Sequence, residues 1–219
     1  MINDKHVDSK NEGYYRRNRS WTQYFDIKRD SKILDVGCGH GLLGKYLNDT
    51  LGAQVTGIEI VKSCYYAAKE KLHEVILGDI ETMDLAMLDK DYDYVIFSDS
   101  LEHLINPDIA LLKVLSLLKK DGNLLISIPN VQNFRITLPL LLKGSWEYTE
   151  DGLMDRTHLR WFTETSITSL VEQNGFQLQQ LERELPLSSK SGKLNLVTFS
   201  LLQNHLTSHF YLKACLADS

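Results

Sequence analysis

Acidic residues follow three short apolar runs of the sequence, at places where they could hold the polar groups of a nucleoside ligand. Asp35 lies in KILDV, Glu59 closes QVTGIE, and Asp79 follows EVIL in the tripeptide GDI. An acid in the second place suits the two vicinal hydroxyls of a ribose. Asp79 could accept a hydrogen bond from an adenine amino group while Ile80 packs on the ring. The three acids together predict a ligand with an amino acid, a ribose and an adenine.

A glycine-rich loop follows the first of these runs. ILDVGCGHGLLG places Gly37, Gly39, Gly41 and Gly44 between Asp35 and a helical pattern. Glycine is needed where the backbone turns tightly and approaches a ligand closely, and a helix N-terminus offers free N–H groups to a carboxylate. Gly39 to Gly44 also match the G-x-G-x-x-G of dinucleotide-binding folds, but Gly37 is the glycine that follows the strand, so the register differs. We expect Asp35 to organise the loop and to meet an ammonium group.

A second polar cluster follows the fourth apolar run. Asp99, Glu102 and His103 lie within FSDSLEHLINP, and His158 lies in DRTHLRWFT. Histidine titrates near neutral pH and can take a proton from a hydroxyl or an amine. Two carboxylates one helical turn apart beside a histidine could also hold a divalent metal ion, with His158 completing the site. Structural alternatives stay open for both histidines: a lid-supporting role for His158 and a pocket-shaping hydrogen bond for His103.

Alternating strands and helices must position these residues. Strands are predicted at 32–36, 54–58, 74–77, 92–97 and 123–128, and helices at 41–52, 61–72 and 107–120. The strands are continuously apolar, which indicates a parallel sheet buried on both faces. Strand–helix–strand repetition with right-handed crossovers predicts a doubly wound α/β sandwich.

The pattern changes after residue 130. Residues 131–162 show no clear period, and we expect them to form an irregular insertion that folds over the substrate as a lid. The sequence then predicts a helix at 163–175, strands at 176–184 and 195–202, and a short terminal helix.

Composition limits the class of protein. The 219 residues are 43% hydrophobic and carry a net charge of −5, which fits a globular domain and argues against a mainly electrostatic grip on nucleic acid or anionic membrane. No apolar run reaches the ~18 residues of a membrane helix, and the polar N-terminus has no signal peptide. We therefore expect a soluble, cytoplasmic protein with an N-terminal helical arm (1–30) and one main domain (31–219).

The chain closely resembles the class I S-adenosylmethionine-dependent methyltransferases. ILDVGCGHG resembles their first motif, GIE the second, GDI the third, FSDSLEHLINP the segment after the fourth strand, and LKKDGNLLISIPN the fifth. The resemblance implies a Rossmann-like, seven-stranded, mostly parallel sheet whose last strand is antiparallel, with the lid inserted after the fifth strand. It also implies S-adenosyl-L-methionine as the cofactor.

The resemblance further assigns site residues. Gly37 and Gly39 would bind the methionine part, Glu59 the ribose, and Asp79 with Ile80 the adenine. The full set that we expect at the cofactor is Asp35, Gly37, Cys38, Gly39, Glu59, Ile60, Asp79, Ile80 and Ser98. His158 and His103 are the expected catalytic residues.

A narrower likeness concerns the segment GSWEYTEDGLMDRTHLRWFT. It resembles part of the type 11, 12 and 23-like small-molecule methyltransferases associated with surface-polysaccharide biosynthesis. Trp146, Tyr148 and Trp161 could stack on sugar faces, although Trp161 equally suits the core of the lid. This likeness predicts O-methylation of a small molecule such as a sugar, a nucleotide-sugar or a glycan intermediate.

Alternative functions stay open. With Asp99 in place of the first glutamate, the cluster around Glu102 and His103 resembles the metal site of small-RNA terminal 2′-O-methyltransferases and of some ubiquinone O-methyltransferases. A metal-assisted enzyme of the ubiquinone or RNA 2′-O type is therefore one alternative. A catalytically silent cofactor-binding protein and a nicotinamide-dependent oxidoreductase are others. No basic stripe supports nucleic acid as a partner, and the sequence does not decide between a monomer and a homodimer.

Overall fold

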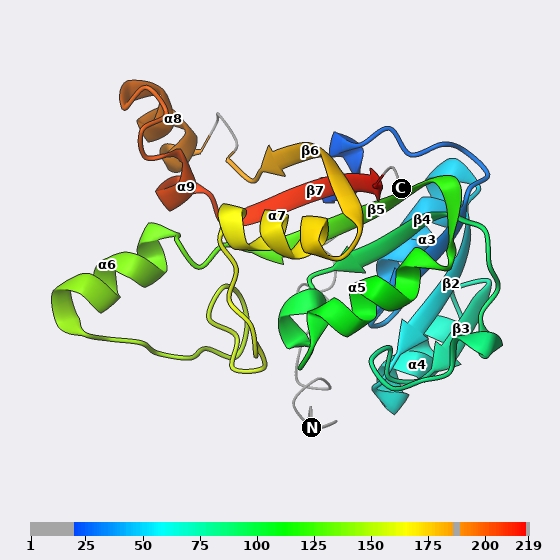
Figure 1. The fold of residues 1–219 in the computed structure, drawn as a ribbon. Helices are drawn as coiled ribbons and strands as arrows, with labels where there is room; N and C mark the ends of the chain where they lie inside the picture. Colours follow the sequence, from blue (N-terminus) through cyan, green and yellow to red (C-terminus); the bar gives the residue numbers. More distant parts are fainter. Residues whose placement is uncertain (1–19, 186–188, 218–219) are drawn as a thin grey trace.

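A seven-stranded sheet crosses the middle of the fold in the computed structural model, which describes residues 20–185 and 189–217 (Figure 1). The strand order is β3-β2-β1-β4-β5-β7-β6. The strands are β1 (Lys32–Val36), β2 (Gln54–Glu59), β3 (Glu74–Leu77), β4 (Tyr92–Ser98), β5 (Leu118–Pro129), β6 (Phe176–Arg183) and β7 (His209–Leu216). β1 to β5 pair in parallel, and β7 pairs antiparallel with both β5 and β6. The predicted α/β class and the Rossmann-like sheet with an antiparallel last strand are confirmed.

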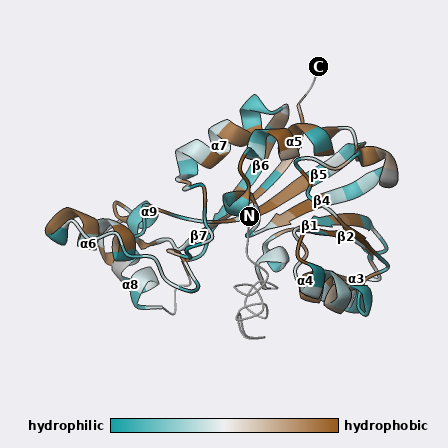
Figure 2. Cartoon of the chain, turned by 90° about the horizontal axis from the view of Figure 1, so that it is seen from below, coloured by the Kyte–Doolittle hydropathy of each residue, from teal (hydrophilic) through white to brown (hydrophobic). Residues whose placement is uncertain are grey.

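Helices cover both faces of the sheet, with α5 and α7 on one side and α3 and α4 on the other (Figure 2). The helices are α3 (Leu42–Leu51), α4 (Lys62–Lys69), α5 (Pro107–Leu115), α6 (Phe134–Lys143), α7 (Glu164–Gln173), α8 (Lys190–Val197) and α9 (Gln203–Leu206). Short 3₁₀ turns are η1 (Ser20–Tyr24), η2 (Leu85–Met87) and η3 (Leu101–His103). Among the described residues, no helix combines the length and the apolarity that a membrane crossing requires.

Successive side chains of a strand contribute to two hydrophobic cores, one on each face of the sheet. In β4, Val95 and Phe97 join the core under α5 and α7, whereas Tyr94 and Ile96 join the core under α3 and η1. Successive side chains of a strand point to opposite faces, so a strand buried on both faces must be apolar at every position. This requirement explains the unbroken apolar runs of the sequence.

Two predicted boundaries around β5 are wrong. The helix expected over 107–120 ends at Leu115, and β5 already begins at Leu118. Leu117 and Leu118 are buried, and the backbone N–H of Tyr92 in β4 donates to the carbonyl of Leu117 at 2.9 Å. Pairing with the neighbouring strand therefore overrides the helical spacing of the leucines.

The predictions for the C-terminal region are also partly wrong. Residues 195–202 form no strand, because 190–197 belong to α8. The short helix expected after residue 202 is present as α9, but it is not terminal, because strand β7 follows it. Val197, Phe199 and Leu201 are 74%, 89% and 84% exposed, whereas Phe210 and Leu212 of β7 are buried. Residues 131–162, expected to be irregular, include helix α6.

Residues 1–19 of the predicted N-terminal arm lie outside the described residues. Trp21 of η1 and the following Phe25 pack into the second core, under α3.

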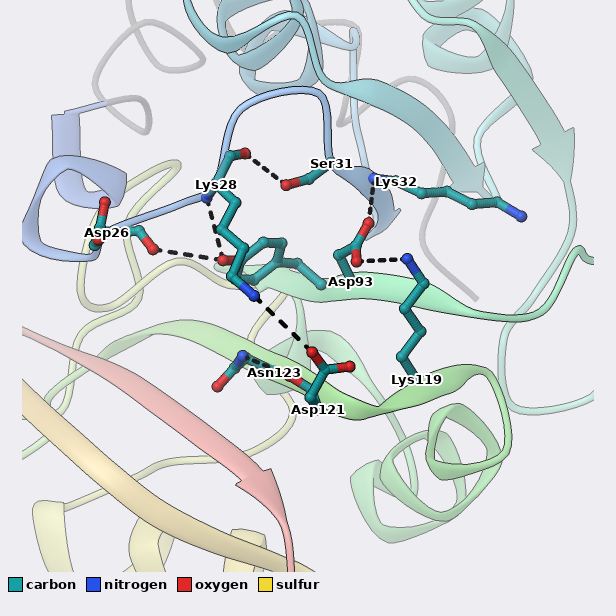
Figure 3. A network of polar contacts seen from close by, with 9 residues as sticks. Asp26, Lys28, Ser31, Lys32, Asp93, Lys119, Asp121 and Asn123 are labelled. Atoms are coloured by element: carbon teal, nitrogen blue, oxygen red, sulfur yellow. Dashed lines mark hydrogen bonds and ion pairs between the residues drawn. The ribbon is translucent and has the colours of Figure 1, made fainter.

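A polar network ties the starts of β1, β4 and β5 together at the edge opposite the glycine loop (Figure 3). Asp93 accepts hydrogen bonds from the backbone N–H of Lys32 at 2.8 Å and from the Lys119 ammonium at 2.6 Å. These hydrogen bonds and the Lys119 charge outweigh partial burial and hold the pKa of Asp93 below its usual value. The carboxylate therefore connects three neighbouring strands.

Replacing this carboxylate should weaken the fold. Asp93→Ala leaves a backbone N–H of Lys32 without its acceptor, and we expect the free energy of unfolding to fall by about 1–3 kcal/mol. Asp89→Ala is the matched control, because it removes only a solvent-exposed ion pair with Lys32 at 3.1 Å, worth about 0–1 kcal/mol. Urea denaturation measures both, and equal losses would contradict the structural role of Asp93.

Candidate functional site

A cavity of about 300 Å³ opens at the carboxyl ends of β1 to β4. Its lining includes these residues from the sequence prediction: Gly37, Gly39, Glu59, Ile60, Asp79, Ile80 and His103. Carboxyl ends of parallel strands meet at one edge of the sheet, where ligands of open α/β sheets bind. We call this space the first cavity.

Positive φ angles shape the glycine loop beside the cavity. Gly37 and Gly39 have φ angles of 77° and 53°, a region that favours glycine. A Cβ at Gly37 would lie only 2.8 Å from the Cβ of Ser100, so the loop after β1 packs directly on the loop after β4. The backbone N–H groups of Gly37 and Cys38 donate to the Ile58 carbonyl at 2.9 and 3.1 Å, which attaches the loop to β2.

Glu59 connects the loops after β1 and β2. Its carboxylate accepts from the backbone N–H of Gly39 at 2.7 Å and of Val61 at 2.8 Å. Burial raises the pKa of Glu59, and these backbone hydrogen bonds oppose the rise. A carboxylate has about four acceptor sites, so Glu59 can also accept from two hydroxyls of a ligand.

The loop after β3 forms another wall. Ile80 is buried, Ile60 is half exposed, and both line the cavity, so an aromatic ring can enter between apolar surfaces. The Lys113 ammonium donates to the carbonyls of Ile80, Glu81 and Met83 at 3.0, 3.0 and 2.8 Å. This lysine of α5 fixes the loop, a role that the sequence pattern did not predict.

Three of the predicted cofactor residues are absent from the lining. Asp35 is 1% exposed and has no hydrogen-bond partner among the described residues. Its burial, and secondarily the charge of Glu59, raise its pKa to about 7. Cys38 is buried against β2, where a Cβ at Gly57 would meet its Sγ at 2.6 Å. Ser98 accepts a hydrogen bond from the Trp21 indole at 3.1 Å, so the structure does not bring its hydroxyl into the cavity.

Ser100 is a lining residue that the sequence analysis missed. Its side chain is buried, and its hydroxyl has no hydrogen-bond partner among the described residues. A buried hydroxyl without a partner is costly, so this group can be satisfied by a polar group of a ligand. The alternating glycines, the Glu59 acceptor and the apolar ring site together fit an adenosyl amino acid.

A second cavity, of about 270 Å³, lies beside the first and shares Asp99 with it. Its polar and aromatic lining includes Trp21, Asp99, Glu102, Ser127, Arg135, Asp151, His158, Glu184, Ser208, His209 and Tyr211. The residues come from η1 and η3, from the ends of β4, β5, β6 and β7, from α6 and from the 144–163 segment. A polar compartment therefore adjoins the first cavity.

Glu102, His103 and His158 meet at the boundary of the two cavities. One potential ligand atom of each lies within 4.8 Å of the others, and Oε1 of Glu102 is 3.9 Å from Nε2 of His158. His103 lines the first cavity, whereas Glu102 and His158 line the second. Asp99 is not part of this group, and its carboxylate accepts from the Ser127 hydroxyl at 2.5 Å.

Backbone hydrogen bonds hold the 144–163 segment over this group. The N–H groups of Leu159 and Arg160 donate to the Glu102 carbonyl at 2.8 and 3.0 Å. Nδ1 of His103 lies 3.1 Å from the carbonyl oxygen of Thr157, within hydrogen-bond distance. The position of His158 is therefore set by its neighbours along the chain.

A further histidine–carboxylate pair in the second cavity was not anticipated. Nδ1 of His209 lies 3.0 Å from Oε2 of Glu184, and the Ser208 hydroxyl donates to the same oxygen. The hydrogen bond with His209 is the main cause that lowers the pKa of Glu184 to about 2. Burial lowers the pKa of His209, but the Glu184 hydrogen bond and the charges of Asp99 and Glu184 outweigh it and raise the pKa.

The aromatic residues of the 144–163 segment pack on one another. Ring centroids of Trp146 and Trp161 are 5.3 Å apart, and those of Tyr148 and Trp161 are 6.2 Å apart. Trp161 also meets His158 at 5.6 Å. None of these three aromatic side chains lines the second cavity; within the described residues, its aromatic lining is Trp21 and Tyr211, stacked at 5.7 Å.

A family model described as a methyltransferase domain matches residues 10–181. The chain is similar to the ubiquinone biosynthesis O-methyltransferase of Coxiella burnetii, with 29% identity over 170 residues that cover 71% of each chain.

Solved structures share the fold. A SAM dependent methyltransferase from Archaeoglobus fulgidus has a TM-score of 0.65 and 20% identity, over 97% of both chains. Phosphoethanolamine N-methyltransferase 2 of Haemonchus contortus, solved in complex with S-adenosyl-L-methionine, has a TM-score of 0.64 and 15% identity, over 93% of this chain and 53% of that one.

The buried Asp35 predicts a pH-dependent stability. A folded-state pKa of about 7 against an ordinary 3.8 means that the folded chain keeps a proton that the unfolded chain releases. Stability should therefore fall as pH rises from about 4 to about 7 and then level off. Asp35→Asn lacks this loss, so its advantage in the ligand-free protein should grow over that range to a few kcal/mol.

Urea denaturation at a series of pH values measures the difference. Asp93→Asn is the control, because the lowered pKa of Asp93 makes its contribution constant above about pH 5. A difference between Asp35→Asn and the wild type that does not change with pH would contradict the raised pKa.

Proposed function

The chain belongs to the methyltransferase-domain family and is an S-adenosylmethionine-dependent methyltransferase, and we propose that it methylates a hydroxyl oxygen of a small polar acceptor, such as a sugar, a nucleotide-sugar or a glycan intermediate. One observation carries the proposal: Glu102, His103 and His158 lie between the first cavity and the polar second cavity. A group at this boundary reaches both a methyl donor and an acceptor.

The first cavity binds the cofactor in this proposal. Glu59 accepts from the ribose hydroxyls, and Ile60 and Ile80 pack on the adenine. Gly37 and Gly39 let the backbone approach the methionine part, and Ser100 gives its hydroxyl to a polar group of the same ligand. The bound cofactor supplies an electrophilic methyl group on a sulfonium sulfur, and the chain aligns it with the acceptor.

His158 is the proposed general base. Its ring lines the second cavity, and the Glu102 carboxylate, 3.9 Å away, stabilises the charge that the imidazole gains when it takes the hydroxyl proton. His103 and the Glu102 carbonyl hold the segment that carries His158. Holding base and acceptor in one geometry is a large part of the rate gain available here.

The second cavity supports a hydroxyl-rich acceptor. Carboxylates and the Ser127 and Ser208 hydroxyls can accept hydrogen bonds from sugar hydroxyls, and Arg135 and His209 can donate. Trp21 and Tyr211 add aromatic surface for a sugar ring. This mixture of convergent polar groups and aromatic surface is typical of small-molecule sites.

A metal-assisted O-methyltransferase is the second candidate. The ligand atoms of Glu102, His103 and His158 lie close enough for one divalent ion, and a similar protein is named as a ubiquinone biosynthesis O-methyltransferase. A metal there would lower the pKa of the acceptor hydroxyl directly.

The base assignment predicts a selective loss of turnover. His158→Ala should lower kcat about 10²- to 10⁴-fold, with little change in S-adenosylhomocysteine affinity. Transfer of radiolabelled methyl to a panel of sugars and glycans measures turnover, and calorimetry measures affinity. His73→Ala, at an exposed histidine, is the control, and a wild-type rate for His158→Ala would refute the base.

Metal removal separates the two candidates. Because an imidazole base needs no ion, we expect the protein dialysed against a chelator to keep its methyl transfer rate. Loss of the rate on dialysis and recovery with added Mg²⁺ would favour the metal-assisted candidate, provided that Glu102→Ala loses the recovery.

The ribose assignment predicts weaker cofactor binding. Glu59→Ala should reduce affinity for S-adenosylhomocysteine by about 1–3 kcal/mol, because ribose hydroxyls and loop N–H groups lose their acceptor. Calorimetry measures the change, with Glu74→Ala at the opposite end of the sheet as the control. Unchanged affinity would contradict the assignment.

A further inference from the structure

Helices α6, α8 and α9 lie at one end of the molecule, beyond the sheet (Figures 1 and 2). Hydrogen bonds connect the base of α6 to α9. The Asn130 amide donates to the Asn204 carbonyl at 2.7 Å, and the buried Asn133 amide donates to the Thr207 carbonyl at 2.8 Å. The chain before α6 is therefore attached to α9, and the Gln203 N–H of α9 donates to the Ser200 carbonyl in the turn that follows α8, at 3.1 Å.

Helix α6 turns its apolar face to solvent. Phe134, Leu138, Leu141 and Leu142 follow an i, i+4, i+7, i+8 spacing and share one face, with 39%, 47%, 80% and 69% of each residue exposed. Ile136, on the opposite side of the helix, is the buried residue of α6. A helix at the surface of a globular protein normally has the reverse arrangement.

The end of α8 and the chain that follows it add further exposed apolar side chains. Val197, Phe199 and Leu201 are 74%, 89% and 84% exposed. Together with the apolar face of α6 they form what we call the α6–α9 surface. Exposed apolar side chains that gather at one end of a molecule mark an interaction site more often than single scattered residues do.

The charge of this region is opposite to that of the whole chain. The chain carries a net charge of −5, yet residues 131–146 and 189–208 contain no aspartate or glutamate. The same segments contain Arg135, Lys143, Lys190 and Lys193, all exposed. Within these two segments the charged residues are therefore all basic, and the nearest acids, such as Glu147 and Asp151, line the cavities beside Arg135.

We propose that the α6–α9 surface docks on an anionic lipid membrane. Apolar side chains that enter the headgroup region and basic side chains that meet anionic lipids are the two contributions that hold proteins at such a surface. A second copy of the chain is a poorer occupant, because a two-fold contact of this surface with itself would bring lysines and arginine against each other. The acidic net charge of the whole chain does not oppose docking, because charges beyond a Debye length are screened.

Docking through α6 and α9 would also bring the second cavity close to the membrane. Arg135 of α6 lines that cavity, and Ser208, just after α9, lines it as well. A docked molecule therefore holds its second cavity near the headgroups. An acceptor with a lipid anchor could enter from the membrane; this last step rests on the proposed function, whereas docking itself does not.

Sedimentation of the full chain with vesicles tests docking. We expect binding to vesicles of phosphatidylcholine and phosphatidylserine, at least about tenfold weaker binding to phosphatidylcholine alone, and weakening by salt. The variant Leu141→Ser/Leu142→Ser removes apolar insertion, and Lys190→Glu/Lys193→Glu reverses the charge. Each should lose about tenfold or more in vesicle affinity.

Matched controls lie on α4, far from this surface. Lys62→Glu/Lys69→Glu makes the same change of net charge, and Tyr66→Ser removes a side chain of a residue that is 65% exposed. Both should bind vesicles like the wild type, and all variants should keep wild-type affinity for S-adenosylhomocysteine, which shows that they are folded.

Three outcomes would overturn docking: no vesicle binding by a folded wild-type chain, equal binding to both vesicle types, or equal losses in the surface and control variants. A concentration-dependent dimer that Leu141→Ser/Leu142→Ser abolishes, without vesicle binding, would assign the surface to self-association instead. Any of these results leaves the methyltransferase assignment intact, whereas vesicle binding without methyl transfer to any acceptor would count against the proposed function alone.

Discussion

The carboxylate of Glu59 is the contact on which the first cavity depends. It lies at the end of β2, and two backbone N–H groups, one in the loop after β1 and one in the loop after β2, donate to it. The glycine loop can approach β2 this closely because Gly37 and Gly39 adopt positive φ angles. A buried carboxylate needs such donors to remain charged, so the loop conformation and the Glu59 carboxylate support each other.

Asp35 is buried like Glu59, but no hydrogen bond from the described residues compensates for the burial of its carboxyl group. Its carboxyl oxygens have no hydrogen-bond partner among the described residues, and the nearby charge of Glu59 adds to the cost of ionisation. Two acids at adjacent strand ends thus behave differently because only one of them receives backbone donors. In the second cavity the Glu184–His209 pair shows the opposite case, since each partner stabilises the charged form of the other.

Sequence patterns predicted the first five strands and most of the lining of the first cavity. β1, β2 and β4 are buried at nearly every position, and the lining residues directly follow the strands. The patterns were misleading where tertiary contacts decide. β7 contains Lys213 and looks less apolar than 195–202, yet it lies between two strands, whereas the more apolar segment is exposed. This error concealed Glu184 and His209, since nothing in the predicted order brought them near His158. Ser98 is absent from the lining for a simpler reason: strand alternation turns it toward Trp21, away from the cavity that Phe97 lines.

The order of the last strands affects how the chain acquires its fold. β7 comes after β6 in the chain but lies between β5 and β6 in the sheet (Figure 1). During synthesis, β6 therefore has no strand to pair with until the ribosome has released β7, although α7 is already available to pack on it. Pairing between β5 and β7 also closes a long loop, which is a slow step in folding. Until then β5 keeps an open edge, a site at which nascent chains can associate wrongly, so this topology leaves the chain open to misassembly until late in its synthesis.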